Sequence, residues 1–314
     1  MNKKLFKAFT LIELLVVMAI IGILSALVII GMNSTTQKAT IAKAQVFSNS
    51  LRNSLMDDLV SEWKFDDASS GSSIAAVDSW NRMNDGDLVN FDFNTTDGWR
   101  TGANCLSGNC LLLDGSNDYV DCGTNTSLDF GNGTIDNPFT LSGWFKMSDM
   151  TRKGLMGKYV VSYQYLLWLT SEDKLSFSLY DGTTAYIRRY YNAPLTNYEN
   201  QWINIVATYD GSESSAGMKI YLNGTRADDT TDNAGVYVAM EQLGVAFRIG
   251  TFGAGAYYVS GLIDDARIFD AAMPTSQIQQ NYFAGLNKIF TKQIISTAEY
   301  QKRIAGLTSN HAKN

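Results

Sequence analysis

The segment QWINIVATYDGSESSAGMKIYLNG, residues 201–224, decides the fold class. In its first part, residues 202–209, apolar side chains recur at every second position, which is the period of a strand with one buried face: Ile203, Ile205, Ala207 and Tyr209. A second short run with strand character lies at 219–222, and the Asn223-Gly224 pair that follows it is a preferred tight hairpin turn. The segment therefore predicts two antiparallel strands.

Similar short runs continue on both sides of this segment, separated by Gly, Asn and Asp. Asp181-Gly182 marks a second hairpin. The chain contains 26 Gly, 16 Tyr and 15 Phe but only 3 Pro, a composition that favours β structure. We expect a mainly β body at 61–275, built as a two-sheet sandwich or jelly roll. The expected strands are 62–65, 110–113, 119–122, 139–147, 165–169, 175–180, 186–191, 202–209, 219–222, 247–249 and 261–269.

The C-terminal part, residues 276–314, reads as helices and a tail. Apolar residues recur at helical spacing over 276–290. Ser296 followed by Glu299 forms a capping box for a second helix at about 297–307. We expect these helices to dock on the body.

The N-terminal part reads as a single long helix. Residues 9–32 form a mostly apolar run with a single ionisable group, Glu13, and about 36 Å of helix is enough to cross a bilayer. Lysines precede this run, so the short basic end should stay in the cytoplasm and the body outside. An apolar stripe then continues the helix as a stalk to residue 60: Ala44, Phe47, Leu51, Leu55 and Leu59.

Residues 7–29, KAFTLIELLVVMAIIGILSALVI, closely resemble the signal helix of type IV pilins and of type II secretion pseudopilins. The resemblance implies a leader at 1–8, cleavage between Ala8 and Phe9 by a prepilin peptidase, and methylation of the new N-terminus. It also implies sister pilins, an assembly ATPase and its platform protein as partners. Glu13 would pair with the N-terminal ammonium of a neighbouring subunit in the apolar filament core.

The sequence departs from the family pattern in two ways: Ala8 stands where Gly is usual, and the apolar stretch lacks a late Pro. Two other interpretations of this segment remain open. A secretory signal could end at Ser25-Ala26, or the helix could be an ordinary membrane anchor. Neither of them gives Glu13 a partner.

The body resembles a laminin-G-like domain of the concanavalin A-like superfamily. The resemblance rests on five motifs in order: LLLDGSNDYVDCG (111–123), FTLSGWFK (139–146), the opening segment (201–224), FRIG (247–250) and GLIDDARIFDAAMPTSQI (261–278). Members of this superfamily bind carbohydrates or proteins, some hydrolyse glycosides, and some bind calcium. The resemblance therefore implies a glycan or protein ligand.

We expect no hydrolase activity. Glycosidases of this kind need two carboxylates flanking one bond, and the glutamates of the body stand alone in the sequence: Glu172, Glu199, Glu213 and Glu241. Asp264 and Asp265 are adjacent, so on a regular strand they would point to opposite faces. His311 is the single histidine, which argues against a catalytic histidine in the body.

No cofactor is required, but calcium is a candidate. Asp114, Asn117 and Asp118 offer oxygens in one turn, and the family places the strand of Asp264 and Asp265 near it. The alternative is that these side chains only cap the turn and bond to backbone.

The remaining signals concern charge, aromatic residues and cysteines. Residues 66–285 hold 26 Asp or Glu against 13 Lys or Arg, which argues against nucleic-acid binding. Cys105 and Cys110 bracket a Gly-containing loop and are the favoured disulfide, which leaves Cys122 as a buried thiol. Five tyrosines could stack on sugars or could belong to the core: Tyr186, Tyr190, Tyr191, Tyr257 and Tyr258.

These observations favour a pilin-like filament subunit that displays an adhesin-like or lectin-like module. It would sit in the cytoplasmic membrane before assembly and at the cell surface afterwards. The first alternative is a type II secretion pseudopilin, and the second is a membrane-anchored glycan-binding protein outside any filament.

Overall fold

The computed structural model describes residues 57–67, 75–94, 96–182, 184–253 and 257–309. The chain divides into two compact units, residues 1–50 and 51–314, and every described residue belongs to the second. The predicted leader, Ala8, Phe9, Glu13 and the helix up to residue 56 lie outside the described residues. Within the described ranges, no helix is both long and apolar enough to cross a membrane.

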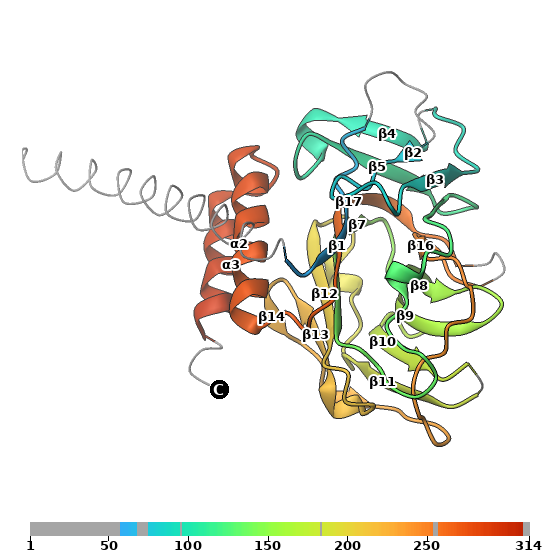
Figure 1. Ribbon diagram of the computed structural model, residues 1–314. Coiled ribbons are helices and arrows are strands. Elements are labelled where there is room, and N and C mark those ends of the chain that lie inside the picture. Colours follow the sequence, from blue (N-terminus) through green and yellow to red (C-terminus); the bar gives the residue numbers. More distant parts are fainter. Residues whose placement is uncertain (1–56, 68–74, 95, 183, 254–256, 310–314) are drawn as a thin grey trace, which may run out of the picture. The chain divides into compact units, whose positions relative to one another are not determined.

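The described unit is a sandwich of two antiparallel sheets (Figure 1). Sheet A has the order β14-β13-β12-β7-β17-β5-β4, and β1 also pairs with β17. Its strands are β1 (Leu59–Trp63), β4 (Gly98–Thr101), β5 (Asn109–Asp114), β7 (Phe139–Met147), β12 (Ile203–Tyr209), β13 (Met218–Leu222), β14 (Thr225–Arg226) and β17 (Ser260–Phe269).

Sheet B is the second layer, with the order β15-β11-β10-β9-β8-β16-β6-β3-β2. Its strands are β2 (Ala75–Ala76), β3 (Gly86–Val89), β6 (Tyr119–Asp121), β8 (Lys153–Tyr159), β9 (Tyr163–Leu169), β10 (Leu175–Tyr180), β11 (Tyr186–Tyr190), β15 (Thr230–Thr231) and β16 (Arg248–Ile249). Short 3-10 turns lie at Gly102–Asn104, Thr126–Leu128, Thr196–Tyr198 and Ser215–Gly217.

The main core fills the space between the sheets. Every second residue of β12 points into it, as the sequence predicts: Ile203, Ile205, Ala207 and Tyr209. In β9 the alternating set of Tyr165, Leu167 and Leu169 does the same from sheet B. Asn223-Gly224 joins β13 to β14 with both residues at positive φ, 52° and 74°, as a tight primed turn requires. The predicted mainly β sandwich is therefore confirmed.

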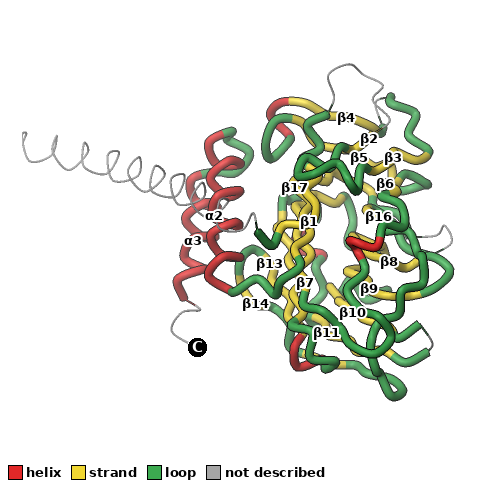
Figure 2. The backbone as a smooth tube through the Cα atoms, viewed as in Figure 1, coloured by secondary structure: helices red, strands yellow, loops and turns green. Residues whose placement is uncertain are grey.

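Two C-terminal helices, α2 (Thr275–Thr291) and α3 (Thr297–Ser309), cover the outer face of sheet A (Figure 2). Trp144 of β7 stacks on Tyr282 of α2 with ring centroids 5.6 Å apart. Further contacts come from Leu286, Ile289 and Tyr300, which pack in the same apolar cluster as Trp202. The Ser296 hydroxyl accepts a hydrogen bond from the Glu299 N–H at 3.2 Å, so the predicted N-cap is present. The predicted docking of the helices is confirmed.

The boundary between stalk and body differs from the expectation. Leu59 was expected in the apolar stripe of the helix, but β1 begins there, two residues before the predicted start of the body. Leu59 pairs with Phe269 of β17 and packs against the cluster around Tyr221 and Ile278. Its apolar side chain therefore packs on sheet A instead of continuing the stripe of a helix, and the assignment of 59–60 to the helix is wrong.

Helix docking gives a matched pair of glycine substitutions. A Cβ at Gly285 in α2 would lie 2.3 Å from Cζ2 of Trp144, whereas a Cβ at Gly306 in α3 meets nothing within 4 Å. We expect Gly285→Ala to destabilise the protein by about 1–3 kcal/mol, because it pushes α2 off sheet A. Gly306→Ala should stabilise it by about 0.5–1 kcal/mol through helix propensity. Urea unfolding of both variants tests this, and effects of the same sign would contradict it.

Candidate functional site

The outer face of sheet B carries the aromatic surface of the sandwich. On β9, Leu166 and Trp168 point away from the main core and pack with Phe252 instead. Tyr159 and Tyr257 are partly buried against this cluster. Ser176 and Ser178 of β10 have small side chains beside Trp168, which is paired with Ser176 across the strands. We name this surface, formed by β8 to β11 and residues 252 and 257, the aromatic face.

A pocket of about 330 Å³ opens on the aromatic face where β9 turns into β10. Trp168 and Tyr190 supply its rings, and Thr170, Ser171 and Glu172 supply hydroxyls and a carboxylate. Its cations are Arg152, Lys174 and Arg188. Rings with neighbouring polar groups are the usual lining of a small-ligand site.

Arg188 is fixed in place within this pocket. Its Nη1 donates to Asp232 Oδ2 at 2.8 Å and its Nε to Ser178 Oγ at 3.0 Å. The same Ser178 oxygen accepts from Trp168 Nε1 at 3.1 Å. Ser178 thereby holds both the guanidinium and the indole, while Asp232 neutralises the charge of Arg188.

Arg152 is held in a different way, by rings. Its guanidinium carbon lies 4.3 Å from the ring centroid of Tyr257, 5.5 Å from that of Phe252 and 5.7 Å from that of Trp168. The side chain is exposed. Within the described residues, Arg152 makes neither a hydrogen bond nor an ion pair.

Two tyrosine hydroxyls of the aromatic face, those of Tyr159 and Tyr186, remain protonated at neutral pH. Burial raises the pKa of Tyr159 and of Tyr186 above the usual tyrosine value. The Tyr186 hydroxyl donates to Asp232 Oδ2 at 3.2 Å. At neutral pH these groups are hydrogen-bond donors.

The structure divides the five tyrosines singled out in the sequence. Tyr186 and Tyr190 of β11 lie on the aromatic face, as does Tyr257. Tyr191 packs against the main core, and Tyr258 lies against Tyr119. The sequence reasoning missed Trp168, Arg152 and Arg188. Alternation along β9 could have indicated Trp168, because it is out of phase with Tyr165 and Leu167.

The predicted cation turn is capped by its own backbone. Asp114 Oδ1 accepts from the Ser116 N–H at 2.7 Å, and Asp118 Oδ2 accepts from the Asp114 N–H at 2.9 Å. Asp118 Oδ1 is buried and has no hydrogen-bond partner. Burial raises the pKa of Asp118 to about 7. A pocket of about 260 Å³ lies beside the turn, between Asp114, Lys146 and Ser260.

Asp264 and Asp265 do not join this turn. Asp114 pairs with Ser260 at the start of β17, so Asp264 lies four residues further along, about 13 Å away at strand spacing. Within the described residues, no three His, Cys, Asp or Glu side chains form a group that could hold a metal ion. The two segments therefore do not fit one shared calcium, and that expected arrangement is wrong.

A bulge in β17 also changes the expected directions of the two carboxylates. The register with β7 shifts between Asp264 and Arg267, and Asp265 adopts φ 49°. Asp264 pairs with Trp144, whose ring faces the helices, and Asp265 Oδ2 accepts from Lys288 Nζ of α2 at 3.1 Å. Both carboxylates thus lie on the helix-covered side, and the expectation of opposite faces is wrong.

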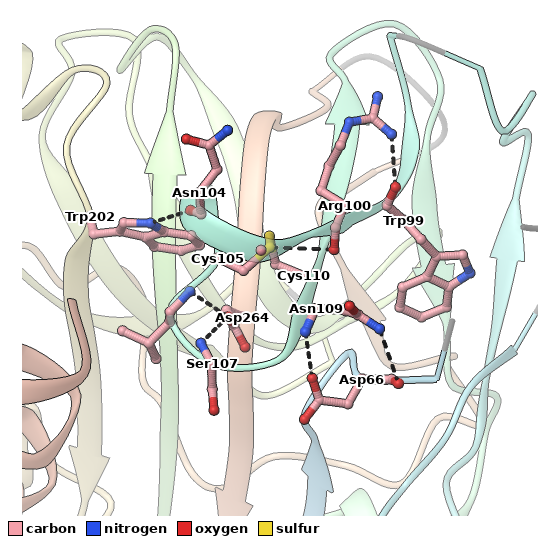
Figure 3. Close-up of a disulfide and its surroundings, with 12 residues drawn as sticks. Asp66, Trp99, Arg100, Asn104, Cys105, Ser107, Asn109, Cys110, Trp202 and Asp264 are labelled. Atoms are coloured by element: carbon pink, nitrogen blue, oxygen red, sulfur yellow. Dashed lines mark hydrogen bonds between the residues drawn. A yellow bond between two sulfur atoms is a disulfide. The ribbon is translucent and has the colours of Figure 1, made fainter. Parts of the chain in front are cut away.

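Asp264 anchors the loop that the disulfide closes (Figure 3). Cys105 and Cys110 are joined, as the sequence reasoning favoured, and Cys122 is a buried free thiol. Asp264 Oδ2 accepts from the Leu106 N–H at 2.9 Å and the Ser107 N–H at 3.2 Å. Trp202, which directly precedes β12, donates from Nε1 to the Asn104 carbonyl at 2.9 Å. The loop is therefore held by sheet A.

The two neighbouring carboxylates have opposite protonation tendencies. Burial, followed by the charge of Asp265, raises the pKa of Asp264 to about 8. Asp265 is buried too, but Arg267 and Lys288 outweigh that burial and lower its pKa. Asp264 Oδ1 is buried and has no hydrogen-bond partner, so an ionised Asp264 would hold part of its charge there without compensation.

Asp264→Asn tests this assignment. Folding favours protonated Asp264, so its contribution to stability is full below about pH 4 and is lost as pH rises towards 8. The amide keeps an acceptor and cannot ionise. The free energy of unfolding of the wild type, relative to the variant, should therefore fall over this range by at most about 1.4 kcal/mol per pH unit. Denaturant unfolding at several pH values measures it. The exposed Asp87→Asn serves as control, and a flat difference for Asp264→Asn would refute the assignment.

The chain matches two known families. Residues 3–29 match the prokaryotic N-terminal methylation motif, which is the pilin-type signal. This motif implies a prepilin peptidase and pilus assembly. Residues 114–279 match the concanavalin A-like lectin/glucanases superfamily. No curated protein matches the chain.

The sandwich is similar to several solved structures of toxin binding domains. The binding domain of Paraclostridial Mosquitocidal Protein 1 aligns with TM-score 0.53 at 16% identity, covering 74% of this chain and 53% of that one. The Botulinum neurotoxin serotype D binding domain gives TM-score 0.52 at 16% identity, with 74% and 52% coverage. A complex of the latter with N-acetylneuraminic acid gives TM-score 0.51 at 15% identity, also with 74% and 52% coverage.

The chain spans about half the length of these structures, and at such identity the likeness concerns the fold alone. The family match, in contrast, covers more than half of the chain and includes the strands around β7, β12 and β17. Behind its pilin-type N-terminal motif, this chain belongs to the concanavalin A-like lectin/glucanases superfamily.

Proposed function

We propose that this protein is a subunit of a type IV pilin-type filament and displays a glycan-binding sandwich at the cell surface. One observation carries the proposal: a pilin-type motif and a lectin-like sandwich with an aromatic pocket occur on the same chain. The motif would direct insertion, processing and assembly, and the sandwich would bind the ligand.

The arrangement of the layers supports the aromatic face as the binding surface. The outer face of sheet A is covered by α2 and α3, which pack on it through Trp144 and Trp202. The aromatic face carries the pocket with Trp168 and Tyr190. Aromatic rings stack on the apolar faces of sugars, and polar groups beside them select the hydroxyl pattern. One of the similar solved domains has been crystallised with N-acetylneuraminic acid.

We further propose a binding role without catalysis. Glycoside hydrolysis needs two carboxylates open to the substrate. Asp264 and Asp265 lie on the same side of β17 and are both buried. Asp264 is engaged by backbone N–H groups of the disulfide loop, and Asp265 by Arg267 and by Lys288 of α2. Their contacts suit a structural role.

A type II secretion pseudopilin is the alternative, because the same signal motif serves both systems. Exposure of the sandwich on intact cells favours the filament subunit, whereas accumulation of exported proteins after deletion would favour the pseudopilin. A membrane-anchored glycan-binding protein would retain its residues before Phe9.

The N-terminus provides the first test. We expect the protein recovered from cells to begin at methylated Phe9, by intact mass and N-terminal analysis. Glu13→Ala should be processed normally but should be absent from sheared filaments, because the N-terminal ammonium loses its partner. Protein that still begins at Met1, or normal filaments containing the Glu13→Ala variant, would contradict the filament half of the proposal.

Glycan binding provides the second test. Tyr190→Ala should weaken binding to a glycan array by about tenfold, because a stacked ring is lost from the pocket. Tyr119→Ala, which removes a ring three strands away from β9, is the matched control and should bind normally. Equal binding by both variants would show that the glycan does not use the aromatic face.

A further inference from the structure

Charge distinguishes the pocket on the aromatic face from the rest of the body. Residues 66–285 hold twice as many acidic as basic residues, 26 against 13. The pocket has a small excess of the opposite sign, because it contains three basic residues, Arg152, Lys174 and Arg188, and two acidic ones, Glu172 and Asp232. A locally cationic pocket on an acidic body needs an explanation.

Two of the three cations are neutralised within the protein. Arg188 forms an ion pair with Asp232, and Lys174 forms one with Glu172. Both have acceptors of their own, so neither requires a ligand.

Arg152 is the exception. Phe252, Trp168 and Tyr257 surround its guanidinium, and these contacts attract the positive charge without accepting an N–H hydrogen bond. Within the described residues no acceptor is bonded to it, although a guanidinium has five N–H donors. The rings fix its position beside the pocket and leave its donors for solvent or a ligand.

We propose that the aromatic face binds a glycan carrying a carboxylate, and that Arg152 forms the ion pair with this carboxylate. A planar guanidinium matches a carboxylate in a two-bond geometry. Trp168 and Tyr190 border the same pocket and provide rings for the sugar that bears the acid. This inference rests on the proposed glycan-binding function and names the class of ligand. Sialic acids and uronic acids share the required chemistry.

The test uses the full-length protein in detergent and two acidic probes, 3′-sialyllactose and a hyaluronan tetrasaccharide. Each is compared with its carboxyl-reduced form, in which a neutral CH₂OH replaces the carboxylate. We expect at least one acidic probe to bind at least about tenfold more tightly than its reduced form. The preferred probe identifies the acid as sialic or uronic. The preference should decrease with added salt.

Variants assign the effect to Arg152. Arg152→Met keeps an apolar stem over the rings and should abolish the preference for the acid, whereas Arg152→Lys should retain part of it. Arg248→Met is the matched control, because Arg248 also stacks on a ring, Tyr119 at 4.6 Å, but pairs with Asp121 outside the pocket. It should bind like the wild type.

The possible outcomes distinguish the proposed carboxylate recognition by Arg152 from the proposed glycan binding on which it rests. Equal affinity for acidic and reduced probes, or a preference that survives Arg152→Met, overturns the inference and leaves glycan binding intact. Absence of binding to every probe, acidic and reduced, overturns the inference together with the proposed glycan binding.

Discussion

The position of β17 is the constraint on which the rest of the structure depends. It is the last strand in the sequence, yet it lies inside sheet A with β7 along one side. Its first half pairs with β5 and its second half with β1 on the other side. The pairing of sheet A is therefore incomplete until β17 is in place. The next helix in the chain, α2, then packs on the outer face of that sheet.

The bulge at Asp264–Arg267 lies between the part of β17 that pairs with β5 and the part that pairs with β1. It turns two adjacent carboxylates to the same side, where Asp264 holds the disulfide loop and Asp265 binds Lys288 of α2. Buried charges need partners, and here Arg267 provides one for Asp265 while burial keeps Asp264 protonated. Such a bulge leaves no pattern in the letters GLIDDARIFD, so a regular strand was the natural expectation and it led to the wrong side for Asp265.

Sequence patterns predicted the strands that bury one face, such as β12, because their period of two is uninterrupted. They missed β8, KGLMGKY, since two glycines and two lysines do not resemble a buried strand. The glycines are needed because a Cβ at Gly154 or Gly157 would lie 2.5 Å from a carbonyl oxygen. Its lysines are buried in ion pairs with Asp149 and Asp129. In the same way, Tyr186, Tyr190 and Tyr257 could be singled out in the sequence as rings able to stack on sugars, but only the folded sheet brings Arg152 to Trp168.

The helices α2 and α3 cover the outer face of sheet A and leave the outer face of sheet B as the open surface of the sandwich among the described residues. The chain enters the sandwich at β1 and leaves it through β17, and both are strands of sheet A. Entry, exit and helix docking thus all use one layer, whereas sheet B contributes its inner side to the core and carries the aromatic face on its outer side. A subunit that is tethered through residues preceding β1 can therefore change the residues of the aromatic face without changing its attachment. This separation suits a binding module whose ligand varies while its anchoring remains fixed.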